Sequence, residues 1–339
     1  MVPILAISQG DPAGVGPEIL CKLLSVSPPE QGWRPLLVAE RAAIRALPES
    51  VRNRIEDRLV DVDPDMDRAA LDAMEPEALL ILDPVAEERA IELGTSGPAD
   101  AAGAIAAIDA AVEVVQGGIA DALVTLPVSK ESIAKHHLAE FRGHTEYLAA
   151  KANLDRYGRD FLMAFLAPEL QVALLTTHVP LRQAIDDLSS RQIVEAIELL
   201  HAHAGGRMAV AGLNPHAGEA GLMGDEEDRL IRPAILEAQQ KGIPAVGPES
   251  PDSLFARARR GEFDWVLALY HDQGLIAVKT ASFGTATNWT LGLPFLRTSV
   301  DHGTAFGIAG KGVADEGPLA QVIATTLGLI SGRLPAISS

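Results

Sequence analysis

Residues 3–18 read Pro-Ile-Leu-Ala-Ile-Ser-Gln-Gly-Asp-Pro-Ala-Gly-Val-Gly-Pro-Glu, and this stretch decides the class of fold. The apolar run 3–8 predicts a buried strand, and the loop 9–18 leads into a helix that continues through Leu24. The glycines of the loop match neither the Walker A spacing nor the dinucleotide Gly-x-Gly-x-x-Gly pattern. The loop therefore predicts a tight strand-to-helix turn, with Pro17 near the first helical position, and not a Rossmann nucleotide loop.

The same alternation of short apolar runs and amphipathic stretches continues along the chain. Further strands are expected at residues 36–39, 79–82, 122–124, 173–175, 208–212 and 265–268. Helices are expected between them, among others at 99–117 and 190–204. Strand–helix alternation predicts an α/β fold with a largely parallel sheet. The polar stretch 47–76 is expected to be a solvated surface excursion, and 243–253 a loop.

The composition limits the classes of protein to which the chain can belong. Its 339 residues are enough for two domains of ~100–200 residues each. The formal net charge of −18 argues against nucleic acid and anionic lipid as partners, because no stripe of Lys and Arg offsets it. The single cysteine, Cys21, excludes an intrachain disulfide and is expected to be buried. We read neither a signal peptide nor a membrane span, and therefore expect a cytoplasmic protein.

Three histidines stand in separate segments, each shortly after an expected strand. They are His178 in Thr-Thr-His-Val-Pro, His216 in Asn-Pro-His-Ala-Gly and His271 in Tyr-His-Asp-Gln. Catalytic groups of α/β folds gather beyond the carboxyl ends of the strands. Neutral imidazole is the commonest protein ligand of divalent transition metals. The pattern predicts a catalytic metal site that keeps open positions for a substrate.

Two carboxylates accompany these histidines, and the residues alone leave their roles open. Asp272 is a candidate metal ligand, a group that supports a metal ligand, or a general base. Asp252 is either close enough to reach the site or the N-cap of a helix that starts before Leu254.

A second group of residues indicates an anionic substrate. The turn at His144 and Thr145 leads into a helix, so its backbone N–H groups and the imidazole can bind an anion; helix capping alone is the other interpretation. Lys279, Asn288 and Arg297 stand in a region otherwise poor in positive charge. Arginine suits recognition of carboxylate or phosphate through two bonds, although each of these charges alone is compatible with an ordinary surface position.

Six segments together resemble the 4-hydroxythreonine-4-phosphate dehydrogenase family: GDPAGVGPEI (10–19), GHTEYLA (143–149), TTHVPL (176–181), NPHAGEAGLMGDEE (214–227), YHDQG (270–274) and TLGLPFLRTSVDHGTAFGIAGK (290–311). They run in the family's order over nearly the whole chain. The resemblance implies the fold of isocitrate and isopropylmalate dehydrogenases, two α/β domains with a cleft between them. The expected domains are 1–130 plus 290–339 on the cofactor side, and 131–289 on the metal and dimer side.

The resemblance also implies roles for individual residues. The implied metal ligands are His178, His216 and His271, one of them from the partner subunit of an obligate homodimer. The implied substrate contacts are His144, Thr145, Lys279, Asn288 and Arg297, and the implied catalytic groups are Asp272, Lys279 and Asp252. The implied contacts to NAD or NADP are His302, Gly303, Thr304, Ala305, Ile308 and Gly310. The implied metal is zinc in the first place, with cobalt or magnesium as alternatives.

The activity that the resemblance implies is metal-assisted oxidation of 4-phosphohydroxy-L-threonine at C3 by NAD(P), as a step of pyridoxine biosynthesis. Decarboxylation to 3-amino-2-oxopropyl phosphate follows. Two departures from the family pattern, Trp289 and the Leu-Pro-Val-Ser-Lys segment 126–130, keep 4-phospho-D-threonate or 4-phospho-D-erythronate open as substrate. A metal-dependent hydrolase is the rival class, but it would not need the segment 301–311. The sequence does not choose between NAD and NADP, between the metals, or between Asp272 and Lys279 as proton relay.

Overall fold

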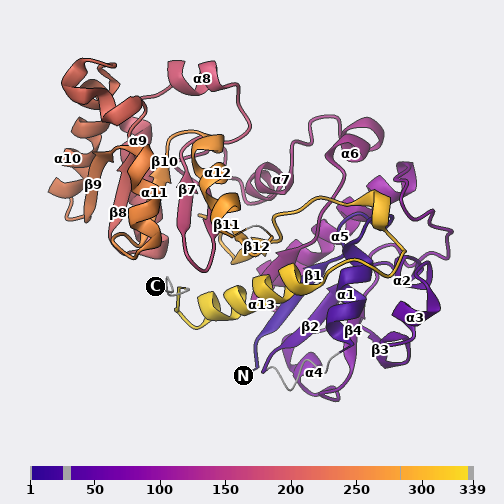
Figure 1. Ribbon diagram of the computed structural model, residues 1–339. Helices are drawn as coiled ribbons and strands as arrows, with labels where there is room; N and C mark the ends of the chain where they lie inside the picture. The colour runs from indigo at the N-terminus through magenta and orange to yellow at the C-terminus, as the bar shows by residue number, and fades with distance from the viewer. Residues whose placement is uncertain (1, 26–31, 283, 335–339) are drawn as a thin grey trace. The chain divides into compact units, whose positions relative to one another are not determined.

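The computed structural model describes residues 2–25, 32–282 and 284–334, and its fold is of the α/β class, as the sequence predicts (Figure 1). The chain divides into two compact units: unit 1 is Met1–Leu148 with Pro294–Arg333, and unit 2 is Ala149–Leu293. The expected boundaries at 130 and 290, the cleft, and the assignment of cofactor and metal to different domains remain predictions. Residues 335–339 of the first expected domain lie outside the described residues.

Unit 1 is built on a parallel sheet. Its strands are β1 (Ile4–Ser8), β2 (Arg34–Val38), β3 (Leu59–Asp61), β4 (Leu79–Leu82), β5 (Ala122–Thr125) and β12 (Arg297–Ser299), in the order β3-β4-β2-β1-β5-β12. Its helices are α1 (Gly16–Leu24), α2 (Arg41–Arg45), α3 (Glu49–Arg52), α4 (Arg68–Asp72), α5 (Pro98–Gln116), α6 (Lys130–His136) and α13 (Gly317–Ile330), and α7 (His144–Lys151) begins in it. Helices α1 and α13 pack together, and α5 packs on β1, β2 and β5. The central strands are buried throughout, which explains their continuous apolar sequences.

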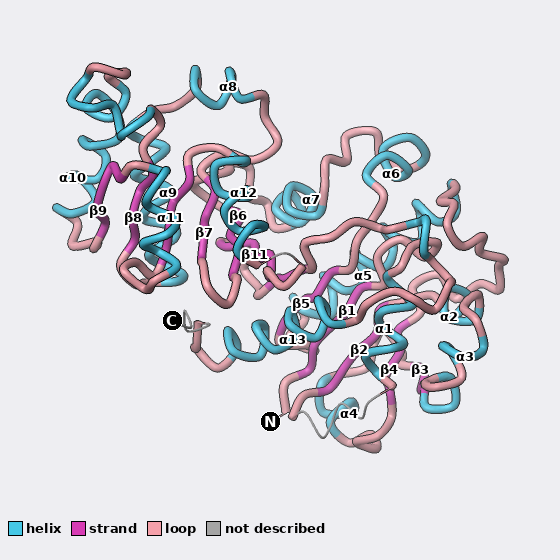
Figure 2. Tube along the Cα trace, in the orientation of Figure 1, coloured by secondary structure: helices cyan, strands magenta, loops and turns pink. Residues whose placement is uncertain are grey.

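Unit 2 has a mixed sheet (Figure 2). Its strands are β6 (Leu162–Leu166), β7 (Gln171–Leu174), β8 (Met208–Ala211), β9 (Ala245–Glu249), β10 (Trp265–Ala268) and β11 (Thr287–Leu291), in the order β11-β6-β7-β10-β8-β9. Strands β7, β10, β8 and β9 pair in parallel, whereas β6 is antiparallel to both of its neighbours. Its helices are α8 (Leu181–Asp186), α9 (Ser190–Ala204), α10 (Arg232–Gln240), α11 (Pro251–Arg259) and α12 (His271–Ala281). Helices α11 and α12 pack on the parallel strands, and α9 packs on β6 and β11.

The strands and helices expected from apolar runs are all present, but the sequence missed five strands. These are β3, β6, β9, β11 and β12. The expectation of a loop at 243–253 is wrong, because this stretch forms β9 and the start of α11. Pro248 makes the sequence of β9 look like a loop, because proline is rare within strands. It is tolerated here since β9 lies at the edge of the sheet. The polar stretch 47–76 forms short elements, of which β3 is largely exposed.

Two further expectations concern Cys21 and the membrane. Cys21 is fully buried, and burial raises the pKa of its thiol to about 12, so it is an unreactive core residue. Within the described residues, no helix combines the length and the apolarity that crossing a bilayer requires.

A buried charge network fixes the loops that follow β1 and β2. Glu40 is 1% exposed and accepts hydrogen bonds from Gln9 Nε2 at 3.0 Å and from Arg89 Nε at 2.6 Å. Arg89 Nη1 also donates to Asp100 on α5 at 2.8 Å. A β-carbon at residue 103 would lie 2.1 Å from Glu40 Oε1, so only Gly103 admits the carboxylate. The network therefore holds one guanidinium between two carboxylates that have little access to water.

Replacing Arg89 with alanine should destabilise the protein strongly, because Glu40 and Asp100 would remain buried without their cation. We expect the free energy of unfolding in urea to fall by roughly 3–5 kcal/mol. Arg45→Ala is the matched control, since Arg45 pairs with Glu56 and Glu88 at the surface, and it should cost at most about 1 kcal/mol. Equal effects of the two substitutions would contradict this account of the network.

Candidate active site

Two of the three candidate metal histidines meet in unit 2. The ring centroids of His178 and His271 lie 5.2 Å apart, with an angle of 42° between the rings. They meet because they follow β7 and β10, which pair in parallel and end at the same edge of the sheet. The Oδ1 atom of Asp272 lies 2.7 Å from Nδ1 of His271. This contact orients the ring and leaves Nε2 of His271 for a metal.

Both histidines line a cavity of about 200 Å³. Its other lining residues are Thr176, Thr177, Val179, Leu181, Ala184, Tyr270 and Asp272. The lining of the cavity combines hydroxyl, imidazole and carboxylate groups with the apolar side chains of Val179 and, on α8, of Leu181 and Ala184. It has room for a metal ion and a few substrate atoms, but not for a dinucleotide.

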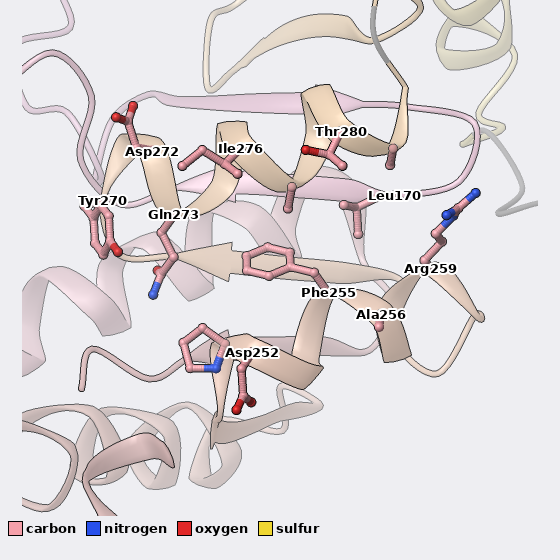
Figure 3. A pocket seen from close by; sticks show the side chains of 13 residues that line it. Leu170, Asp252, Phe255, Ala256, Arg259, Tyr270, Asp272, Gln273, Ile276 and Thr280 are labelled. Carbon is pink, nitrogen blue, oxygen red and sulfur yellow. The ribbon is translucent and has the colours of Figure 1, made fainter. Parts of the chain in front are cut away.

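A larger groove of about 560 Å³ runs along α11 and α12 (Figure 3). Asp252 and Asp272 stand at the same end of it and point away from each other. Gln273 is buried there: its Nε2 donates to Gly212 O at 2.8 Å, and its Oε1 accepts from Leu269 N at 2.7 Å. Gln273 thereby ties the end of β10, which precedes His271, to the end of β8.

The third histidine, His216, lies in a different place in unit 2. It belongs to the turn η3 (Pro215–Gly221), and its Nδ1 is 3.7 Å from Oδ2 of Asp252. Ser250 is the N-cap of α11, so the interpretation of Asp252 as N-cap is wrong; Asp252 lies in the first helical turn. The pKa of Asp252 is lowered, with Ser250 as the largest cause and Ser253 and His216 as smaller ones.

The three candidate histidines do not form one cluster among the described residues. Among the residues that the structure describes, no group of three or more His, Cys, Asp or Glu side chains is close enough to hold a metal ion. His178 contacts His271, and His216 contacts Asp252, so the candidate residues fall into two pairs.

The backbone around His216 is left-handed over five consecutive residues. The φ angles of residues 216–220 are 51°, 49°, 81°, 42° and 55°, and only Gly218 among them takes this conformation without strain. For the other residue types the left-handed region costs roughly 1–2 kcal/mol each. Interactions outside the turn must therefore hold it.

Three basic residues of unit 1 gather near one another in a cluster: Arg297 is buried, His144 is half-buried and Lys130 is exposed. Arg297 on β12 is 2% exposed and donates from Nη2 to Thr125 Oγ1 on the neighbouring β5 at 2.6 Å. Burial lowers the pKa of Arg297 to about 9, and Glu146 offsets this in part. The planar guanidinium matches the geometry of carboxylate and phosphate groups, so Arg297 suits an anionic ligand.

His144, the first residue of α7, belongs to the same cluster. Burial, followed by the charges of Arg297 and Lys130, lowers the pKa of its imidazole well below 6.5. Its Nε2 atom is buried and has no hydrogen-bond partner among the described residues. Lys130 Nζ lies 3.4 Å from the place where a β-carbon on Gly143 would stand, so the lysine reaches the turn before His144. Thr145, also expected here, is buried in the first turn of α7.

Sequence reasoning missed Lys130, although it had noted the segment 126–130 as unusual. The available indication was its position: Lys130 follows β5 as His178 follows β7, and Ser129 is the N-cap of α6. A basic residue shortly after a strand of an α/β fold is therefore a candidate site residue, as a histidine there is.

The other two expected substrate contacts belong to unit 2. Lys279 is exposed in the last turn of α12, and Asn288 is on β11 with a buried Oδ1 atom that has no partner among the described residues. Trp289, suspected of altering the pocket, is 7% exposed and packs against Trp265 with ring centroids 6.5 Å apart. Neighbouring residues of a strand face opposite sides of the sheet, so Trp289 does not share the face of Asn288.

The segment 302–310, expected to contact the cofactor, forms an exposed turn of small residues in unit 1. Val15 N donates to Thr304 O at 3.0 Å, which attaches the turn to the loop after β1. Ala305 is left-handed, and a β-carbon at Gly310 would lie 2.4 Å from Leu93. Gly303, Ala305 and Ile308 are exposed, and the buried Nε2 atom of His302 has no hydrogen-bond partner in the described part of the chain.

Comparison with known proteins identifies the family. The family model described as pyridoxal phosphate biosynthetic protein PdxA matches residues 33–326. This chain belongs to the PdxA family.

Individual relatives of the PdxA-family chain match it over nearly its full length. A 4-hydroxythreonine-4-phosphate dehydrogenase of Neisseria meningitidis serogroup A is 38% identical, over 98% of this chain and 99% of its own. A D-threonate 4-phosphate dehydrogenase of Salmonella typhimurium is also 38% identical, over 94% and 96%. The crystal structure of 4-hydroxythreonine-4-phosphate dehydrogenase from Klebsiella pneumoniae has a TM-score of 0.82 at 33% identity, over 97% and 99%. The resemblance inferred from the six sequence segments is thus confirmed at the level of the family.

The imidazole of His144 should titrate well below pH 6.5 in an NMR titration, because burial and two nearby cations disfavour its charged form. Arg297→Met should raise the pKa of His144 more than Lys130→Met does, since Arg297 lowers that pKa more than Lys130 does. The free energy of unfolding should therefore be unaffected by His144 above pH 6.5 and should decrease as the pH falls below 6.5. In that range the imidazole is protonated in the unfolded chain but not in the folded one, which favours unfolding. A His144 pKa at or above 6.5 would contradict the cluster.

Proposed function

We propose that this PdxA-family chain oxidises 4-phosphohydroxy-L-threonine at C3 with NAD or NADP and a divalent metal. Decarboxylation to 3-amino-2-oxopropyl phosphate follows, as a step of pyridoxal phosphate biosynthesis. The observation that carries the proposal is the His178–His271 pair at the ends of two parallel strands, with Asp272 bound to His271. The Neisseria relative bears the name of this activity over its full length.

The donor set suits a transition metal. His178 and His271 would supply imidazole nitrogens, and His216 would be the third ligand. A bound zinc or cobalt ion, or magnesium in their place, would act as a Lewis acid toward the substrate hydroxyl and carbonyl oxygens. Asp272 orients His271 through Nδ1, and we assign Lys279 and Asp252 as the candidates for moving the substrate proton.

We propose that the metal site is shared in a homodimer. His216 and the His178–His271 pair would then come from different subunits. Large apolar side chains next to the histidine segments are exposed, which favours burial against a second copy. They are Val179 (41%), Leu181 (54%), Leu222 (83%), Met223 (47%) and Ile276 (67%).

The cationic cluster of unit 1 suits the phosphate and carboxylate of the substrate. Arg297 would bind one anionic group through two parallel bonds, and His144 and Lys130 would add further donors. Thr145, Lys279 and Asn288 are proposed as further substrate contacts.

The turn 302–310 is proposed as the contact to NAD or NADP. Its exposed small residues would let a planar ring approach the backbone, and His302 would offer its Nε2 atom, which accepts or donates no hydrogen bond among the described residues. The nicotinamide would accept the hydride from C3. A hydrolase has no use for such a turn, and the relatives are named dehydrogenases.

A second substrate is D-threonate 4-phosphate, which also carries a phosphate and a carboxylate. It is favoured by the Salmonella relative, which is as similar to this chain as the Neisseria relative is. 4-Phospho-D-erythronate is a further candidate, because it also carries a phosphate and a carboxylate.

A dehydrogenase assay tests the proposal. Chelated protein should be inactive, and zinc or cobalt should restore formation of NADH or NADPH. 4-Phosphohydroxy-L-threonine should be oxidised fastest, with 4-phospho-D-threonate and 4-phospho-D-erythronate next. Arg297→Ala should lower kcat/KM on the order of 30-fold or more, since loss of a buried charge partner costs ~2–5 kcal/mol. Full activity in stringently metal-free protein, or equal turnover of an unphosphorylated hydroxy acid, would refute it.

Mixing inactive chains tests the shared site. His216→Ala and His178→Ala chains should recover about a quarter of the wild-type activity, because half of the dimers are mixed and each carries one intact site. His178→Ala mixed with His271→Ala is the matched control and should stay inactive, since these ligands come from one chain. Recovery in the control and none in the test pair would overturn this division of the ligands.

A further inference from the structure

We propose that Glu227 is a positioning residue that holds the left-handed turn of His216 in its metal-binding geometry. The inference rests on the proposed metal site, because it assigns a structural cause to the placement of one ligand. Glu227 begins the π-helical turn η4 (Glu227–Ile231), and its side chain is 2% exposed.

The carboxylate of Glu227 accepts three hydrogen bonds from the segment just before His216. Its Oε1 atom accepts from Leu213 N and from Asn214 N, both at 2.7 Å. Its Oε2 atom accepts from Asn214 Nδ2 at 2.9 Å. Hydrogen bonds to an ionised acceptor are among the stronger ones in proteins, and here three of them converge on two residues.

The same carboxylate also touches the turn itself. A β-carbon at Gly218 would lie 2.8 Å from Glu227 Oε2, so the turn passes directly over the carboxylate. Backbone hydrogen bonds at the ends of the turn run from Ala217 N to Asn214 O at 3.1 Å, from Leu222 N to Glu219 O at 3.2 Å and from Met223 N to Gly218 O at 3.1 Å. A strained backbone persists only where contacts with its surroundings hold it in place. The hydrogen bonds that Glu227 accepts from Leu213 and Asn214 provide such contacts.

The arrangement links the strand end to the metal ligand in one chain of contacts. Strand β8 ends at Ala211, Glu227 fixes Leu213 and Asn214, and His216 follows two residues later. Displacement of the turn by a fraction of its width would move the imidazole out of coordination range, because metal–nitrogen bonds are short and directional. Glu227 has no role in the chemistry itself.

Glu227→Gln tests the proposal with little change of volume. The glutamine has one acceptor oxygen, and its NH₂ group would face the Nδ2 donor of Asn214. Cobalt affinity of the chelated protein, followed by the absorption of bound cobalt, should fall on the order of 10–100-fold. Amide hydrogen exchange at Leu213 and Asn214 in the metal-free protein should be roughly tenfold faster. Asp228→Asn removes the same charge one residue away at the surface and should change neither quantity.

Gly218→Ala is the second variant, because its β-carbon would crowd the carboxylate of Glu227. It should lower cobalt affinity, as Glu227→Gln does. Unchanged exchange at Leu213 and Asn214 in Glu227→Gln, or cobalt affinity within about threefold of wild type, would overturn the positioning role. His216→Ala separates the two proposals: if it leaves cobalt affinity intact, the metal site is wrong, whereas the exchange rates still decide whether Glu227 fixes the turn.

Discussion

Parallel pairing of β7 with β10 and of β10 with β8 is the constraint on which the candidate active site depends. Strands that run in one direction release their following loops at one edge, so residues distant in sequence meet there. His178 and His271 are brought together in this way, and Gln273 ties the third strand end to them. The sheet thus provides the framework, while single side chains set the orientation of each ligand.

Charge is distributed unevenly in the molecule, and this matters for selectivity. The chain has a formal net charge of −18, yet Arg297 is nearly inaccessible to water and His144 stands beside it. An acidic surface repels anions at long range. Arg297 and His144, by contrast, would bind a small anion that accepts several hydrogen bonds from them. Under the proposed function, an anionic ligand would be recognised by hydrogen bonds at these residues and not by long-range attraction to the protein surface.

The sequence predicted the parts of the fold that depend on continuous burial, and missed those that depend on their neighbours. Central strands such as β1 and β10 are visible as apolar runs because both of their faces are covered. Edge strand β9 contains Pro248 and pairs on one side only, so its sequence resembles a loop. The histidines were found through their positions at strand ends, but the left-handed turn at His216 was not, since its residue types do not favour that conformation.

The packing of Trp289 against Trp265 has a spectroscopic consequence. The chain has three tryptophans; these two are buried together in unit 2, and Trp33 is buried in the core of unit 1. Near-ultraviolet circular dichroism arises from aromatic rings held in fixed asymmetric surroundings and vanishes when the packing loosens. Trp265 is the first residue of β10, and the His271 segment follows the end of this strand. The dichroism of the paired indoles therefore reports, without any added label, the packing of the sheet on which the proposed metal site depends.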